Sequence, residues 1–204
     1  NPRIIITVLD DNLILIDTEN PGVTISEIPT IDSTRPVVEV VCEGVDFEII
    51  PGGKDAIKKT IGVGRVLLAA DILGASLNMI SNAVEYSLER KQFNRVIGSF
   101  QAVKHMCAEM AADIEPCKSL LWYAAYAQDH IKEEADLLSC HVKAHLSEVG
   151  NDTARVSTQV FGGMGFTDLL GMHYWFKRIG LSRQMLGGPE KVRQEAAILQ
   201  GFLS

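Results

Sequence analysis

The stretch Gln159 to Thr167, QVFGGMGFT, has three glycines within four positions at the expected end of a helix. Left-handed caps that end helices explain one or two such glycines. The third suggests a loop whose main chain a ligand approaches closely, as in phosphate-binding loops. Because this loop follows a helix rather than a strand, it differs from the dinucleotide fingerprint. A structural turn and a ligand contact both stay open for this stretch.

A second stretch, Glu89 to Gln101, reads ERKQFNRVIGSFQ and places Arg90 at a helix end. Cations there can simply complement the helix dipole while Phe93 fills the core. Alternatively, Arg90, Phe93 and Gln101 could clamp a pyrophosphate and contact an adenine, because a guanidinium matches phosphate geometry. Both interpretations are compatible with the spacing.

A third group, His141, His145 and Glu148, falls on one helix face at i, i+4 and i+7. This spacing could seat a metal ion. A metal site needs further ligands and hydrogen-bonded supporting partners, and the sequence offers none nearby. We therefore expect no metal, with the histidines at the helix surface or satisfied by neighbours.

The composition limits the class of protein. The chain has 204 residues, of which 47% are hydrophobic, enough to bury a sizeable core. Its 19 basic and 26 acidic residues give a net charge of -7 without a basic tract, so nucleic acid is not an expected partner. We find no secretory signal and no apolar run of membrane-spanning length. The first residue, Asn1, stands within an expected strand and suggests a processed or truncated chain.

The four cysteines are widely spaced and form no CxxC pair. This usage fits free thiols in a reducing compartment better than a disulfide framework. We expect a cytoplasmic protein, with the mitochondrial matrix as the alternative.

The elements that position these residues divide the chain into a β portion, 1–52, and a helical portion, 53–204. Short β-branched runs at 3–10, 12–17, 22–28 and 36–50 are separated by turn residues, which predicts an antiparallel sheet. The PGGKD segment at 51–55 closes this portion. The fold class is therefore α+β, mainly α.

Five helices are expected after residue 55. The first extends to about Gln92 with an apolar stripe, the second covers 98–130 with a kink at Pro116, and the others cover about 133–161, 168–186 and 190–202. Long amphipathic helices with short connections pack as an antiparallel bundle. The stripe of the first helix consists of Leu73, Leu77, Ile80, Val84 and Leu88.

The motifs YSLERKQF, IGSFQAVKHMCAEMA and QVFGGMGFT, in this order, resemble the FAD-dependent acyl-CoA dehydrogenase family, and PGVTISEIPT resembles its central β domain. The resemblance covers nearly the whole chain as the C-terminal half of such an enzyme. It implies part of the β domain followed by the family's C-terminal four-helix bundle. Asn94 stands where a glycine is usual, an exchange that left-handed backbone geometry tolerates.

The resemblance also implies a cofactor, a reaction and partners. The expected reaction converts an acyl-CoA thioester into a trans-2-enoyl-CoA, with a carboxylate base taking the α-proton and FAD accepting the hydride. The expected partners are electron-transfer flavoprotein and further acyl-CoA dehydrogenase-type chains, in a homo- or hetero-oligomer of dimer or tetramer size. The residues matched to contacts with the ADP part of FAD are Arg90, Gln92, Phe93, Gln101, Gln159, Gly162 and Gly163.

The catalytic base is the main departure from the family. The positions where relatives carry a glutamate align with Gly187 and, in a minority, with Gly64 beside Arg65, which is a candidate substrate contact. Glycine cannot take a proton. Glu190 is the nearest carboxylate and the candidate base, although directly after Pro189 it is expected in the first turn of the last helix.

Three hypotheses follow from these residues. The chain is an FAD-binding acyl-CoA dehydrogenase-type chain, a non-catalytic partner subunit or fragment that completes a homologue's FAD site and oligomer interface, or a truncated helical remnant that only self-associates.

Overall fold

The computed structural model describes residues 2–203. Its contacts divide the chain into two compact units, Asn1–Ile61 and Gly62–Ser204, and the division falls within the first helix, which begins at Gly53. Each unit is described by itself.

The first unit holds antiparallel strands, as predicted. β1, β2 and β5 form a three-stranded sheet in the order β1-β2-β5, and β3 pairs with β4 in a separate two-stranded sheet. The single run expected at 36–50 is thus two strands in different sheets. The bounds are β1 (Ile4–Leu9), β2 (Asn12–Asp17), β3 (Val23–Ile28), β4 (Val37–Cys42) and β5 (Glu48–Ile50).

The central strand β2 provides the buried side chains of the three-stranded sheet, namely Leu13, Ile14 and Ile16. A tight turn joins β1 to β2, with Leu9 opposite Asn12, and Asp10 in this turn has a φ of 52°. Asp is one of the few residues that accept this left-handed geometry.

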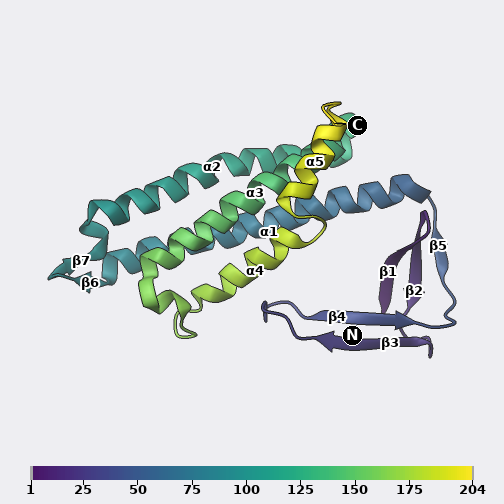
Figure 1. Cartoon of the computed structure of the whole chain (residues 1–204), viewed down its shortest axis with the longest axis horizontal. Helices are drawn as coiled ribbons and strands as arrows, with labels where there is room; N and C mark the ends of the chain where they lie inside the picture. Colours follow the sequence, from purple (N-terminus) through teal and green to yellow (C-terminus); the bar gives the residue numbers. More distant parts are fainter. Residues whose placement is uncertain (1, 204) are drawn as a thin grey trace. The chain divides into compact units, whose positions relative to one another are not determined.

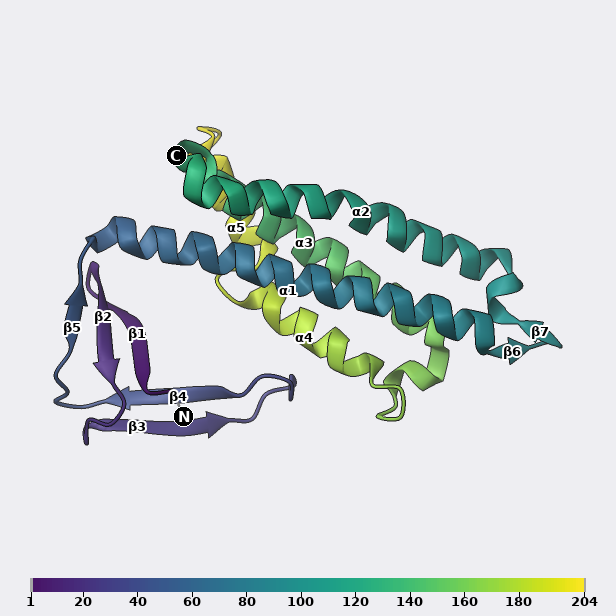
Figure 2. The same ribbon diagram turned by 180° about the vertical axis from the view of Figure 1, so that it is seen from behind.

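The second unit is a helical bundle (Figures 1 and 2). α3 lies at its centre, since it contacts α2, α4 and α5. The main core joins side chains of the first four helices. The helix bounds are α1 (Gly53–Glu89), α2 (Gln101–His130), α3 (Lys132–Phe161), α4 (Met172–Gln184) and α5 (Pro189–Leu199).

The stripe expected on α1 is not the face that packs into the core. Leu73 is buried, but Leu77, Val84 and Leu88 are exposed by 37% to 63%. The face that packs into the core carries both small and large side chains. The buried positions follow the helical period and include Ala69, Ile72, Ser76, Met79 and Ala83.

By length and composition alone, α1 is the one helix among residues 2–203 that could cross a membrane, although the sequence suggested no such run. Of its apolar stretch, 44% is buried inside the chain. The core helix of a soluble protein has the same length and composition.

α2 continues as a helix on both sides of Pro116. Between α1 and α2 lie a small hairpin of β6 (Lys91–Gln92) and β7 (Arg95–Val96) and a 3-10 turn, η1 (Ile97–Ser99). A second 3-10 turn, η2 (Gly162–Phe166), follows α3. α1 ends at Glu89 rather than near Gln92 because the hairpin begins two residues later.

Candidate functional site

Two of the three predicted stretches form one pocket of about 410 Å³. The β6–β7 hairpin and η2 lie at the same end of the bundle (Figures 1 and 2). A cavity of this volume falls in the range of small-molecule sites. Its lining residues are Tyr86, Arg90, Gln92, Ile97, Val160, Phe161, Gly162, Gly163 and Met164.

Arg90 is held at the pocket by its backbone. Its N–H donates to the carbonyl of Tyr86 at 2.9 Å, and its carbonyl accepts from the N–H of Ile97 at 2.8 Å. No hydrogen bond or ion pair engages its guanidinium among residues 2–203. The cation is therefore available to an anionic ligand.

A two-residue turn shapes the hairpin that carries Gln92. Gln92 pairs with Arg95, and the turn residues Phe93 and Asn94 have φ angles of 53° and 63°. Two successive left-handed residues are typical of the tight turn that matches the twist of a hairpin. Asn94 therefore adopts the left-handed backbone conformation that we expected at this position, where the family usually has a glycine.

The three glycines of the second stretch have different causes. Gly162 caps α3 with a φ of 60°, a conformation that favours glycine. A Cβ built on Gly162 or Gly163 would meet nothing within 4 Å, so their main chain borders open space. Gly165 is buried, and a Cβ there would lie 3.1 Å from Phe161 and 3.2 Å from Thr158. One glycine thus serves packing, whereas two leave the main chain open to a ligand.

An aromatic pair forms part of the pocket lining that sequence reasoning missed. The rings of Tyr86 and Phe161 stack with centroids 4.4 Å apart and an interplanar angle of 16°. Tyr86 precedes Arg90 by four residues, and the backbone bond between them places Arg90 one turn beyond Tyr86 at the end of α1. The spacing from Arg90 could have predicted Tyr86 as a lining residue. Phe161 could not be predicted in this way, because it lies at the end of α3, far from Tyr86 in the sequence.

Three other predicted contacts do not line the pocket. Phe93 lies at the hairpin turn with 86% of its surface exposed, and its ring meets Phe100 edge-on at 6.2 Å. Gln101 begins α2 and Gln159 lies in the last turn of α3, and both are exposed.

The two positions aligned with the family's base lie near Leu186. A Cβ on Gly64 would lie 2.5 Å from Cδ1 of Leu186. Gly187 has a φ of 105°, and a Cβ there would lie 3.5 Å from Nη2 of Arg65. Neither position holds a side chain that takes protons.

Arg65, the candidate substrate contact, is buried with internal partners. Its guanidinium pairs with Glu195 at 2.6 Å, donates to the Leu186 carbonyl at 3.0 Å and contacts the Cys140 thiol at 3.2 Å. Burial raises the pKa of that thiol, although the charge of Arg65 opposes the shift. Cys140 is therefore a protonated, neutral partner.

Glu190 lies in the first turn of α5, as expected, with 75% of its side chain exposed. Oε1 accepts a hydrogen bond from Nη2 of Arg183 at 3.1 Å. Its own backbone N–H and Arg183 hold the pKa of this carboxyl below its usual value. A carboxylate stabilised in this way is a weak base.

The candidate metal face takes part in an ion pair. Glu148 binds both terminal nitrogens of Arg193, and this hydrogen bonding lowers the pKa of the carboxyl. Among residues 2–203, no group of three metal-ligating side chains gathers.

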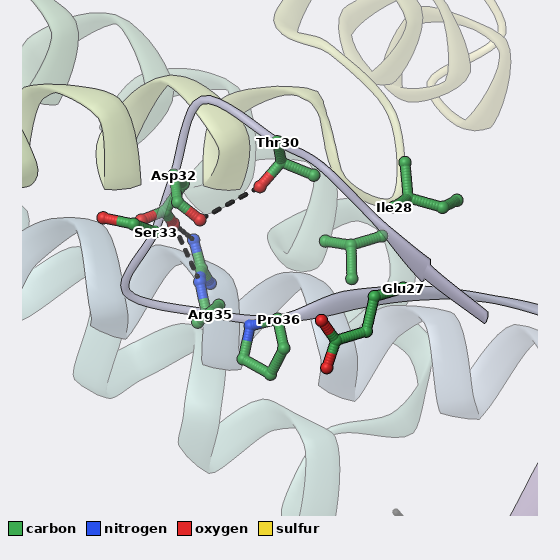
Figure 3. A pocket seen from close by; sticks show the side chains of 8 residues that line it. Glu27, Ile28, Thr30, Asp32, Ser33, Arg35 and Pro36 are labelled. Atoms are coloured by element: carbon green, nitrogen blue, oxygen red, sulfur yellow. Dashed lines mark hydrogen bonds and ion pairs between the residues drawn. The ribbon is translucent and has the colours of Figure 1, made fainter. Parts of the chain in front are cut away.

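A smaller cavity of about 180 Å³ lies at the β3–β4 loop (Figure 3). Asp32, 1% exposed, accepts hydrogen bonds from the N–H and hydroxyl of Thr34 and from Arg35. Burial alone would raise the pKa of Asp32, but these bonds outweigh it and lower the pKa. The polar groups here fold the loop, and no predicted site residue lies among those lining it.

Comparison with known proteins places this geometry in a family. Residues 52–201 match the model of the acyl-CoA dehydrogenase C-terminal domain. The caffeyl-CoA reductase-Etf complex subunit CarC of Acetobacterium woodii is 34% identical over 137 residues, covering 67% of this chain and 36% of the relative. The matched region thus covers less than half the length of that curated relative.

Solved structures show the same fold. A Tcur3481-Tcur3483 steroid ACAD variant is 26% identical with a TM-score of 0.86, covering 98% of this chain and 55% of that one. The ChsE4-ChsE5 complex of Mycobacterium tuberculosis has a TM-score of 0.86 at 22% identity, covering 98% and 56%.

Proposed function

Because the chain belongs to the acyl-CoA dehydrogenase family, we propose that it binds the ADP part of FAD within an assembly that oxidises acyl-CoA thioesters. The observation that carries the proposal is the pocket that brings Arg90 and Gln92 together with Gly162 and Gly163. These segments are separated by about seventy residues of sequence.

The pocket residues fit a diphosphate group. The uncommitted guanidinium of Arg90 matches the geometry of phosphate oxygens. Gly162 and Gly163 leave space for a ligand to approach the main chain, since a Cβ on either meets nothing within 4 Å. In this proposal, the chain holds and orients the cofactor. Bound FAD would supply the acceptor for the substrate's β-hydride.

We extend the proposal to Phe93, Gln101 and Gln159, which lie outside the pocket lining. Exposed aromatic and amide side chains can contact a ligand that extends beyond one chain, and Phe93 is 86% exposed. In this arrangement, these residues reach cofactor shared with a neighbouring acyl-CoA dehydrogenase-type chain. The name of CarC, a subunit of a reductase-Etf complex, supports electron-transfer flavoprotein as the electron partner.

We also propose a reducing compartment, the cytoplasm or alternatively the mitochondrial matrix. All four cysteines are free thiols, and burial raises the pKa values of Cys107, Cys117 and Cys140. Protonated thiols resist oxidation.

Flavin titration tests the cofactor proposal. The assembly is isolated with its natural partners and identified by native mass spectrometry, and FAD binding is then followed by flavin absorbance and the shift in Tm. We expect Arg90→Ala to weaken FAD binding at least about tenfold, the size expected for losing a charge-assisted contact. Arg155→Ala is the control, since Arg155 is an exposed arginine on α3 outside the pocket.

A colourless assembly whose Tm does not respond to added FAD would exclude the proposal. So would equal FAD affinity in the Arg90→Ala and Arg155→Ala variants. In that case the self-associating helical remnant would be the better description.

A second candidate function is that of a non-catalytic partner subunit that completes the FAD site and oligomer interface of a catalytic homologue. The glycines at positions 64 and 187 favour it, because loss of a general base typically costs about 100- to 10,000-fold in rate. The fold shared with a complex of two differently named proteins, ChsE4 and ChsE5, is compatible with it.

Glu190→Gln separates the two candidates. In a partner subunit, turnover of the reconstituted assembly survives this change. If Glu190 is the base, turnover falls at least about 100-fold while FAD stays bound. Arg183→Gln is the control, because it removes the ion pair with Glu190 but leaves the carboxylate in place.

A further inference from the structure

Two aromatic rings connect the two segments that form the larger pocket. Tyr86 lies in the last turn of α1, one turn before Arg90. Phe161 is the last residue of α3, directly before Gly162. Their rings stack with centroids 4.4 Å apart and an interplanar angle of 16°, and both residues line the pocket. The stack therefore links the backbone of Arg90 to the backbone of the glycines.

The Tyr86 end of this link leads directly to Arg90. The carbonyl of Tyr86 accepts the N–H of Arg90 at 2.9 Å, which continues the helical hydrogen-bond pattern one residue beyond α1. Tyr86 is half-buried and packs against the main core of the bundle. A ring held there fixes the last turn of α1, and that turn places the backbone of Arg90 at the pocket.

The Phe161 end leads to the glycines in the same way. Phe161 is 7% exposed and belongs to the main core. η2 folds closely over it, since a Cβ built on Gly165 would lie 3.1 Å from Cβ of Phe161. Gly162 and Gly163 lie between these two residues, so their main chain follows the position of Phe161.

A diphosphate group needs both ends of the link at once. The Arg90 guanidinium and the open main chain at Gly162 and Gly163 belong to segments about seventy residues apart. A ligand that contacts both segments binds tightly only if their separation is set before binding, because ordering them costs free energy. Stacked rings are rigid and attract each other beyond the effect of buried area, so they suit this task better than flexible side chains.

We propose that Tyr86 and Phe161 form a positioning pair, which sets the separation between Arg90 and the main chain at residues 162–163 and so fits the pocket to a diphosphate. The inference rests on the proposed function, which supplies the ligand. The pair acts through Arg90 and the glycines rather than as the phosphate contact itself. Because the rings make the stack, Tyr86→Phe should preserve it.

The first measurement needs no ligand. After removal of any bound flavin, hydrogen exchange of the full chain in its isolated assembly is followed by mass spectrometry for the natural protein, Tyr86→Leu and Tyr86→Phe. Tyr126→Leu is the matched control, because its ring also has a partner, His130 at 4.4 Å, but lies on α2 outside the pocket lining. We expect the amides of η2 to exchange at least about fivefold faster only in Tyr86→Leu, since loss of the stack makes local opening easier.

The second measurement is the affinity for FAD in the natural and Arg90→Ala backgrounds. Tyr86→Leu should weaken FAD binding about fivefold to tenfold in the natural chain, the loss expected from an aromatic pair. In the Arg90→Ala background, the further loss should be no more than about twofold, because the group that the pair positions is already absent. Tyr86→Phe and Tyr126→Leu should bind FAD as the natural chain does. A general loss of stability would not produce this pattern.

Unchanged exchange of η2 in Tyr86→Leu would overturn the positioning pair. Equal losses of FAD affinity in both backgrounds would also overturn it and would show a direct contact between the ring and the cofactor. So would a Tyr86→Phe variant as weak as Tyr86→Leu, which would assign the effect to the hydroxyl. If Tyr86→Leu does not fold, Phe161→Leu removes the same stack from the α3 side and must give the same results.

The positioning pair and the FAD proposal can fail separately. A colourless assembly that does not respond to FAD would exclude the proposed function, while the exchange measurement still decides whether the ring pair holds η2. Conversely, tight FAD binding that Tyr86→Leu does not change would leave the FAD proposal standing and remove the positioning pair.

Discussion

Gly162 and Gly163 are neighbours in sequence but differ in what each position requires of the backbone. Only Gly162 has a positive φ, 60°, whereas both border open space at the pocket. Substituting alanine at each of the two positions therefore separates the effect on backbone conformation from the effect on ligand binding.

Gly163→Ala should leave Tm nearly unchanged but weaken FAD binding about tenfold or more, because the new methyl group enters the space beside Arg90. Gly162→Ala should in addition lower the free energy of unfolding by about 1–2 kcal/mol, the cost of a left-handed alanine. Urea unfolding and flavin titration measure the two effects. Gly163→Ala with unchanged FAD affinity would contradict the placement of the cofactor.

Among the helices, α2 contains a proline in its interior, where this residue is unfavourable. Pro116 lies in the middle of the helix and is exposed. A proline there removes a hydrogen bond and crowds the preceding turn, at a cost of roughly 3 kcal/mol.

Pro116→Ala should raise the free energy of unfolding by about 1–3 kcal/mol, because the helix already continues through this position. Chemical unfolding of the full chain measures the change. The reverse substitution, Ala125→Pro at another exposed position of α2, should cost at least as much. A loss of stability in Pro116→Ala would mean that the surrounding packing requires the proline.

For the whole molecule, Lys143 makes the pH dependence of stability predictable. Burial first, and then the charges of Arg65 and Arg183, lower the pKa of Lys143 from 10.5 to about 8. Between these two values, the unfolded chain binds more protons than the folded chain. Folding stability from this group therefore rises with pH above about 8 and is lost as pH falls through that value.

We expect the natural chain to gain about 2 kcal/mol of unfolding free energy relative to Lys143→Met between pH 7 and pH 10. Taking the difference between the two chains removes groups that titrate alike in both, such as the cysteines. Lys118→Met provides the control, because it removes a lysine whose side chain is 38% exposed on α2. A flat difference between the natural chain and Lys143→Met would contradict the lowered pKa of Lys143.

Much of the architecture could be read from local pattern. Turn residues and β-branched runs predicted the antiparallel strands, and apolar period and helix punctuation predicted five helices close to their observed bounds. Glycine at 162 and asparagine at 94 indicated left-handed backbone, which the structure confirms. These features depend mainly on backbone geometry and on near neighbours, and therefore on short stretches of sequence.

The buried face of α1 and the membership of the pocket depended on tertiary structure. A stripe of large apolar residues selected Leu77, Val84 and Leu88, but helix packing buried a different face of α1. Tyr86 and Phe161 meet from different helices, and Leu186 meets Gly64 from more than a hundred residues away. Sequence alone determined that two base positions lack a side chain; only the packing of distant segments decided what occupies the space beside them.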